Sequence, residues 1–303
     1  MKIAFLFSGQ GAQRPGMGKS FYDADADVRA LFAAAEAIRP GTTAMCFAGD
    51  ETELRRTDNT QPCLYLTDLA AATVMRNLGV SPAAVAGFSL GELPALAYAG
   101  AYTAEAGFAL TCRRGELMQA AAGERDATMA AVIKLPNEVV EAVCAKFNEV
   151  YPVNYNSPGQ LVVAGAAEEM EAFGAAIREA GGRVLPLKVG GGFHSPFMAS
   201  AGEGLVEALA ETEMTLPGIP VYANHTAEPY TGDPRALLGR QIVNPVRWEE
   251  TVRAMAEAGI EAFVEVGIGE TLAKLVSRIL PDAKVWAVSD IESARAAAEA
   301  ILA

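Results

Sequence analysis

The segment that decides the fold is AVAGFSLGELPALAYA at positions 84–99. A short apolar run at 84–86 leads into GFSLG, and a helical pattern begins at Glu92. This order predicts a buried strand, a sharp turn and a helix, the context in which a G-x-S-x-G sequence presents a serine oxygen above a sheet. The alternative is a serine that only caps a helix in a glycine-rich turn. The flanking strand and helix favour the first interpretation, with Ser89 as a nucleophile.

Short apolar runs and helical patterns alternate on both sides of this segment. Helices are predicted between the strands, among them 63–78 and 104–121. The predicted strands are 2–7, 84–88, 218–222, 261–267 and 284–288. Such alternation predicts an α/β fold with a mostly parallel sheet that is covered on both faces.

The middle of the chain follows a different pattern. Its predicted elements are a strand at 128–134, a helix at 136–147, strands at 151–155 and 160–164, a helix at 167–180 and a strand at 183–188. The order βαββαβ is that of a ferredoxin-like unit. We therefore expect a small ferredoxin-like subdomain at 127–190, inserted between two parts of a catalytic subdomain at 1–126 and 191–303. An active site in the crevice between the two is expected.

Composition and charge exclude several classes of function. The chain has 303 residues, with 24 Lys and Arg against 37 Asp and Glu, and hence a net charge of −13. This balance argues against binding to nucleic acid or to an anionic membrane, since both need a basic face. An acidic partner would have to dock on a local cationic patch.

Cysteine and histidine usage argues against metal and disulfide chemistry. The four cysteines are widely separated, with no C-x-x-C pair, and the chain has only two histidines. Neither a zinc site nor a disulfide framework is expected. The apolar run at 3–7 is too short for a signal peptide, and no stretch reaches the roughly 20 apolar residues of a membrane span. We expect a soluble, cytoplasmic protein.

A nucleophilic serine needs a base, and the two histidines differ in their surroundings. His194 lies in GGGFHSPFM, where Ser195 and Pro196 are a good N-cap and first helical residue. The dipole of that helix favours the neutral imidazole that a general base requires. His225 follows a strand in a polar turn, where a solvated loop histidine is the simpler interpretation. We therefore predict His194 as the base.

The sequence GQGAQ at 9–13 follows the first predicted strand directly. Glycines at that position let the backbone and the amide of Gln10 approach a ligand closely. Together with the N–H of Leu90, the residue after the nucleophile, that amide could stabilise an oxyanion. The alternative is a phosphate-binding turn, but neither G-x-G-x-x-G nor a Walker pattern is present.

Two adjacent arginines, Arg113 and Arg114, occur on the predicted helix 104–121. Neighbouring helical side chains point about 100° apart, so at most one of the two faces inward. An inward arginine must find an anion, because an unpaired buried charge is costly. From these residues alone, a salt bridge to a nearby carboxylate is the simpler interpretation.

Taken together, the motifs resemble those of malonyl-CoA:acyl carrier protein transacylases. The resemblance covers the whole chain. The segments that carry it are FSGQGAQ at 7–13, TQP at 60–62, GFSLGE at 87–92, RGELMQ at 114–119, NYNSPGQ at 154–160, FHS at 193–195 and QIVNPVRW at 241–248.

The resemblance implies the roles of the catalytic residues. Ser89 would be acylated by malonyl-CoA, and His194 would act first as base and then as acid. No carboxylate would complete a triad, because the main-chain carbonyl of Gln241 would orient the histidine. Gln10 and the N–H of Leu90 would form the oxyanion hole.

The resemblance also implies the substrate contacts, the fold and the partners. Arg114 would hold the malonyl carboxylate bidentately. Residues in a supporting role would be Gln241, Met118, Asn156 and Phe88. The larger subdomain would be a hydrolase-like α/β core. The malonyl group would pass to the phosphopantetheine thiol of an acyl carrier protein by ping-pong chemistry, with no cofactor or metal, to supply fatty acid synthesis.

Two segments depart from the family pattern. Phe88 stands where the residue before the nucleophile is usually His, and GIGE at 267–270 replaces GPG followed by a basic residue. We expect Phe88 against the acyl pocket, so the preference for malonyl over methylmalonyl or acetyl stays open. The alternatives are an acyltransferase of a polyketide assembly line, the transacylase component of malonate decarboxylase, a serine thioesterase and a non-enzymatic carrier-protein scaffold.

Overall fold

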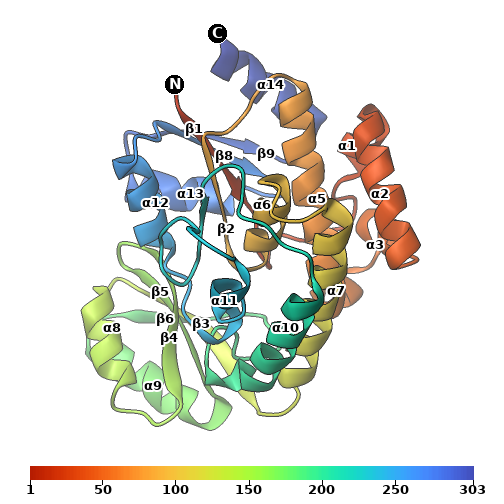
Figure 1. The fold of residues 1–303 in the computed structure, drawn as a ribbon. Coiled ribbons are helices and arrows are strands. Elements are labelled where there is room, and N and C mark those ends of the chain that lie inside the picture. The colour runs from red at the N-terminus through yellow and green to blue at the C-terminus, as the bar shows by residue number, and fades with distance from the viewer.

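The computed structural model describes residues 1–303 and contains two sheets (Figure 1). The larger sheet has five strands, all parallel, in the order β7-β2-β1-β8-β9. In that order the strands are Val221–Tyr222, Ala84–Gly87, Ile3–Phe7, Ala262–Val266 and Lys284–Val288. The predicted α/β fold with a parallel sheet is confirmed.

The central strand β1 is buried on both faces because its side chains alternate between two cores. Phe5 and Phe7 belong to the largest hydrophobic cluster of the protein, whereas Ala4 and Leu6 belong to a second one. Helices α5 and α6 lie on one side of the sheet, and α12 and α13 lie on the other (Figure 1). A parallel sheet needs such double cover.

The helices fall into two groups around the second sheet. Before it come α1 to α7: Lys19–Ala24, Ala26–Ile38, Thr42–Ala48, Glu51–Arg55, Thr57–Asn77, Glu92–Tyr98 and Ala104–Ala121. After it come α10 to α14: Ala199–Glu211, Arg235–Leu238, Trp248–Glu257, Thr271–Ile279 and Ile291–Leu302. Three short 3₁₀ turns are η1 Ser89–Gly91, η2 Pro196–Met198 and η3 Gln241–Val243. None of these helices has the length and hydropathy needed to cross a bilayer.

The second sheet is antiparallel and has the order β4-β5-β3-β6. Along the chain its elements are β3 Ala127–Ile133, α8 Asn137–Cys144, β4 Val150–Ser157, β5 Gln160–Ala166, α9 Ala167–Glu179 and β6 Arg183–Pro186. This is the predicted βαββαβ order. One face packs on α8 and α9, while residues on the other face, such as Val153 and Val162, join the main core. We propose 126/127 and 190/191 as the boundaries of the insert, just outside its first and last strands.

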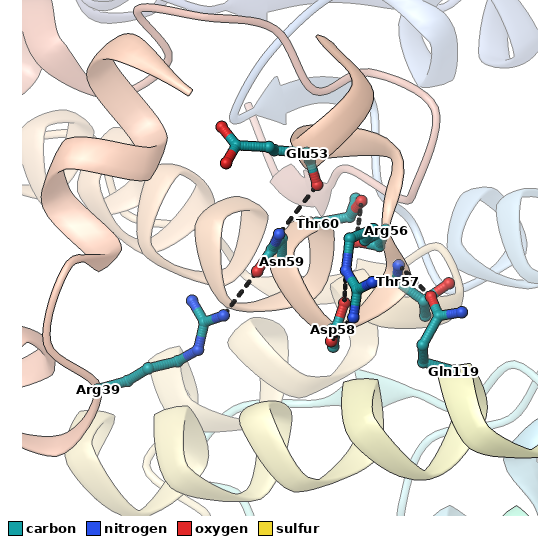
Figure 2. Close-up of polar contacts among 8 residues, drawn as sticks. All are labelled: Arg39, Glu53, Arg56, Thr57, Asp58, Asn59, Thr60 and Gln119. Carbon is teal, nitrogen blue, oxygen red and sulfur yellow. Dashed lines mark hydrogen bonds and ion pairs between the residues drawn. The ribbon is translucent and has the colours of Figure 1, made fainter. Parts of the chain in front are cut away.

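Helix α5 begins six residues before the predicted start at 63, because its polar first turn is stabilised from outside. Thr57 donates its N–H to the side chain of Gln119 on α7, at 2.9 Å (Figure 2). Asn59 accepts a hydrogen bond from Arg39 and donates one to the carbonyl of Glu53. Sequence periodicity cannot show such contacts between distant segments.

Strand β7 is shorter than the predicted 218–222, with only Val221 and Tyr222 in register with β2. Pro217 and Pro220 precede it, and neither has an N–H to donate to a ladder. Pro94, by contrast, fits within the first turn of α6, where no N–H is needed.

The two glycines of G-x-S-x-G are required by close backbone contacts. A Cβ on Gly87 would lie 1.8 Å from the carbonyl carbon of Gly91, and a Cβ on Gly91 would lie 2.2 Å from the carbonyl oxygen of Phe7. The turn after β2 therefore folds back on itself and against the end of β1. Only glycine fits at either position.

We predict that Gly87→Ala lowers the free energy of unfolding by about 3 kcal/mol, the upper part of the usual range for overpacking, since the clash is with backbone. Gly190→Ala is the matched control, because a Cβ there meets nothing within 4 Å. Chemical denaturation of both variants measures the difference, and equal stability would contradict this account of the turn.

Candidate active site

The predicted site residues meet at the carboxyl ends of three neighbouring strands. The segment with Gln10 follows β1, Ser89 follows β2, and Asn224 follows β7. In open parallel sheets this edge is where ligands bind. His194 comes from the segment just before η2, Arg114 from α7, and Gln241 in η3 contacts both, so six separate parts of the chain build the site.

Ser89 lies in a strained turn and contacts the predicted base. Its φ angle is 52°, in the left-handed region that non-glycine residues rarely adopt. The side-chain oxygen lies 2.6 Å from Nε2 of His194. The backbone N–H of Ser89 donates to the side chain of Asn224 at 2.7 Å, which helps to hold the turn.

His194 is buried and is oriented by two main-chain carbonyls. Its Nδ1 lies 3.1 Å from the carbonyl oxygen of Gln241 and 3.2 Å from that of Asn244. A carbonyl can only accept, so Nδ1 carries the proton and Nε2 is free to accept from the Ser89 hydroxyl. Burial is the main cause that lowers the pKa of His194 to about 4, and the charge of Arg114 is the second. The two hydrogen bonds to carbonyls raise the pKa but do not offset these effects. The imidazole is therefore neutral near pH 7, as a general base must be.

Arg114 is fully buried and lies beside the nucleophile. Its Nη2 is 3.4 Å from the Ser89 hydroxyl oxygen. The guanidinium donates to the amide oxygens of Gln61 and Gln241, each at 2.8 Å, and Nε has no partner. Burial lowers the pKa of Arg114 to about 10, while the charge of Glu92 raises it. The salt bridge that seemed the simpler interpretation is not formed: no carboxylate lies within 4 Å of this cation.

The remaining part of the R-G-x-x-M-Q motif supports this arrangement. Met118 is buried, and its sulfur accepts from the amide of Gln61 at 3.3 Å, so it helps to aim the Gln61 oxygen at Arg114. Arg113 faces away, as expected, and pairs with Glu116 on the surface. It lines a surface cavity of about 1270 Å³, which lies between α7 and α10 and contains none of the predicted site residues.

The other predicted residues lie on segments next to the nucleophile. Leu90 follows Ser89 in η1 and is buried, and Gln10 is half-buried. A Cβ on Gly9 would lie 2.7 Å from the carbonyl oxygen of Phe88, so the Gln10 loop packs closely on the residue before the nucleophile. The ring of Phe88 packs edge-on against Trp248, with ring centroids 5.4 Å apart.

Asn156, the remaining predicted residue, lies on β4 and is buried. Its side-chain oxygen has no hydrogen-bond partner. The same is true of the side-chain oxygen of Asn154 two residues earlier. Buried side-chain oxygens usually accept a hydrogen bond. The oxygens of Asn154 and Asn156 are therefore available to a bound molecule.

Comparison with known proteins agrees with this geometry. The family model described as "Acyl transferase domain" matches residues 4–300. The chain belongs to this acyl transferase family. It is 36% identical over 300 residues to the malonyl CoA-acyl carrier protein transacylase of Bacillus subtilis, covering 96% of this chain and 95% of that protein.

Solved structures of similar proteins share the whole fold. A malonyl CoA-acyl carrier protein transacylase from Clostridium perfringens superposes with a TM-score of 0.96 at 33% identity, covering 100% of this chain and 98% of that one. A malonyl-transacylase in complex with a type II polyketide acyl-carrier protein gives 0.95 at 36% identity, covering 99% and 100%. The two-subdomain arrangement therefore belongs to this group of acyl transferases.

Two residues of this acyl transferase site were not predicted from the sequence. Glu92 is buried at the start of α6 and accepts hydrogen bonds from Tyr230 and from the side chain of Gln241. Asn224 bridges the turn by accepting from Ser89 and donating to the carbonyl of Gly87. In the sequence, only the positions of these residues could have indicated a role. Glu92 ends the G-x-S-x-G-E motif, and Asn224 directly precedes His225.

His225 is not part of the catalytic arrangement. It is half-buried and lines a small pocket with Tyr155, Pro245 and Arg247. Burial lowers the pKa of His225, as do the charges of Arg247 and Arg240. The choice of His194 as the histidine beside Ser89 agrees with the geometry.

The depressed pKa of His194 predicts how reactivity depends on pH. The base is neutral above a pKa of about 4. The labelling rate of Ser89 by a small uncharged sulfonyl fluoride should therefore change less than twofold between pH 8 and pH 5.5. An ordinary histidine, with a pKa of about 6.5, would lose about tenfold over the same interval. Ser89→Ala, which should take no label, is the control, and a tenfold loss would show that His194 is not the neutral buried base described.

Proposed function

We propose that this protein transfers the malonyl group of malonyl-CoA to the phosphopantetheine thiol of an acyl carrier protein through a malonyl ester on Ser89. The observation that carries the proposal is Arg114. A fully buried guanidinium lies 3.4 Å from the nucleophile, has an unpartnered Nε–H and no carboxylate beside it. Such a cation needs an anion, and an acyl group with a terminal carboxylate brings one.

The first half-reaction follows from the Ser89 and His194 geometry. Nε2 takes the hydroxyl proton as the serine oxygen attacks the thioester carbonyl, and the resulting imidazolium is stabilised by the carbonyls of Gln241 and Asn244. The tetrahedral oxyanion would be held by the Leu90 N–H and by Gln10. Collapse of this intermediate expels the CoA thiolate, which takes the proton from His194.

The second half-reaction reverses these roles with another thiol. His194 removes the proton from the phosphopantetheine thiol, whose sulfur attacks the malonyl ester, and then returns the proton to the oxygen of Ser89. No metal or cofactor is needed, because the group that is transferred never leaves the acyl level of oxidation.

The named relatives support transfer to a carrier protein rather than hydrolysis by a thioesterase. A similar malonyl-transacylase forms a complex with a polyketide carrier protein. A polyketide carrier protein is therefore a second candidate for the acceptor of the malonyl group. Fatty acid synthesis is our proposal for the pathway, because full-length relatives such as that of Bacillus subtilis are discrete transacylases. The four cysteines are unpaired, which agrees with a reducing cytoplasmic location.

For the carrier protein we propose a docking patch that includes Lys188 and Arg240. Both side chains are exposed, and neither has a carboxylate within 4 Å, whereas Arg247 nearby is paired with Glu250. Arg240 directly precedes Gln241, and Lys188 lies on the segment that leads from β6 to His194. They therefore offer unpaired positive charge next to the site, on a chain whose net charge is −13.

The function is tested by the mass of the intact protein after incubation with malonyl-CoA or acetyl-CoA. The native protein should gain one malonyl group, and Ser89→Ala none. Arg114→Ala should lower the malonylation rate relative to acetylation by a factor on the order of 10²–10⁴. This corresponds to the roughly 3–5 kcal/mol of leaving a buried charge unpaired.

The ratio of the two rates is the informative quantity, because loss of Arg114 also leaves the oxygens of Gln61 and Gln241 without a donor. Arg113→Ala is the matched control and should leave the ratio unchanged. If both acyl groups reacted equally more slowly in Arg114→Ala, the arginine would have only a structural role.

The docking patch is tested by charge reversal. Lys188→Glu combined with Arg240→Glu should raise the KM for the carrier protein about tenfold at low salt and reduce its salt dependence, since charges at the rim act mainly on association. Transfer to free pantetheine, which is uncharged, should not change. Lys284→Glu is the control, since Lys284 is exposed at the amino end of β9, away from the site. An equal effect of the two sets of substitutions would contradict the patch.

A further inference from the structure

One buried carboxylate in the site has no part in the chemistry proposed above. Glu92 is 1% exposed, and its Oε2 accepts from Nε2 of Gln241 at 2.7 Å and from the N–H of Asn224 at 3.2 Å. Its Oε1 has a single partner, the hydroxyl of Tyr230. No lysine or arginine lies within 4 Å, so an ordinary buried salt bridge does not explain it.

Glu92 is nevertheless connected to Arg114 through one amide group. The side chain of Gln241 donates to Glu92 from Nε2 and accepts from Nη2 of Arg114 at Oε1, at 2.7 and 2.8 Å. Burial raises the pKa of Glu92 to about 7, against the hydrogen bonds that it accepts and the charge of Arg114, which lower it. Conversely, the charge of Glu92 helps to keep Arg114 protonated. The two side chains are thus opposite charges separated by a single amide.

The other titratable groups around this pair do not change charge near neutral pH. Burial raises the pKa of Tyr230 and of Tyr102 well above the usual value, so both stay neutral. His194 stays neutral above about pH 4. Arg114 keeps its charge. Glu92 is therefore the group of this cluster that can gain or lose a proton in the working range.

We propose that Glu92 is a specificity-determining residue: it is the counter-charge of Arg114 in the free enzyme, and it takes up one proton from solvent when the carboxylate of the acyl group binds to Arg114. This inference rests on the proposed function. Two carboxylates and one guanidinium in a buried site leave an uncompensated negative charge, which a low-polarity environment disfavours. Protonation of Glu92 restores neutrality, and transfer of the malonyl group to the carrier protein releases the proton again.

The hydrogen bonds of Glu92 allow this change. Backbone and amide N–H groups can only donate, so Oε2 must remain an acceptor. Oε1 faces a hydroxyl, which can reverse from donor to acceptor by rotation. The neutral acid can therefore donate from Oε1 to Tyr230 without leaving any partner unsatisfied. An acetyl group brings no second carboxylate, so Glu92 should keep its charge when acetyl occupies Ser89.

The test is proton uptake during acylation, measured by stopped flow with a pH indicator in weak buffer at pH 7.5. The native enzyme is mixed with malonyl-CoA or with acetyl-CoA, and the signal is normalised to the Ser89 adduct found by intact mass. Both reactions release the same thiol, so their difference isolates the acyl group. From a pKa of about 7, we expect about 0.8 proton more per malonyl adduct than per acetyl adduct.

Variants separate Glu92 from other sources of protons. Glu92→Gln should abolish the difference. Tyr230→Phe should reduce it, because the hydrogen bond from Tyr230 lowers the pKa of Glu92, and without it Glu92 is already more protonated before malonyl binds. Tyr102→Phe is the matched control: its buried hydroxyl donates to the carbonyl of Leu93 instead, so the difference should persist.

The outcomes distinguish this inference from the proposed function. A malonyl adduct that forms with the same proton uptake as the acetyl adduct would overturn the role of Glu92 and leave the proposed function standing. Proton uptake that is specific to malonyl but persists in Glu92→Gln would have the same two consequences. Failure of the native enzyme to form any malonyl adduct would overturn both.

Discussion

The side chain of Gln241 is the constraint on which the rest of the site depends. Its amide oxygen accepts from Arg114, its amide nitrogen donates to Glu92 and to the carbonyl of Ser89, and its own backbone carbonyl orients His194. If the amide were rotated by about 180°, its N–H groups would face the guanidinium of Arg114 and its oxygen would face the carboxylate of Glu92. The opposite charges on its two sides therefore fix its orientation, and with it the relative positions of nucleophile, base and cation.

This network also maintains two strained backbone positions. Ser89 and His194 have φ angles of 52° and 61°, and such residues cost of order 1–3 kcal/mol each. Asn224 accepts the N–H of Ser89, and Ser195 caps η2 directly after His194. With the backbone in this left-handed conformation at both positions, the two side chains meet. Two residues that belong to distant parts of the chain thus come within 2.6 Å.

Local sequence patterns predict what local forces determine. The alternation of strands and helices predicted both sheets, the G-x-S-x-G context predicted the turn at Ser89, and the 100° step between helical residues predicted that Arg113 and Arg114 diverge. The long-range polar contacts could not be predicted from such patterns. Glu92 bonds to Gln241 across 149 positions, and nothing near either residue signals the pair. For the same reason the polar start of α5 was missed, since its cap comes from α7.

The inserted sheet contributes to catalysis through its edge strand. Val246 donates its N–H to Val153 on β4 at 2.8 Å and accepts from the N–H of Tyr155 at 2.9 Å, which adds the segment after η3 to the small sheet. Two residues earlier, Asn244 supplies one of the carbonyls that orient His194. A shift of the small sheet relative to the large one would therefore move a hydrogen-bond partner of the base. Asn244 is one of the two carbonyls that fix the tautomer of His194, so the insert helps to support the catalytic base.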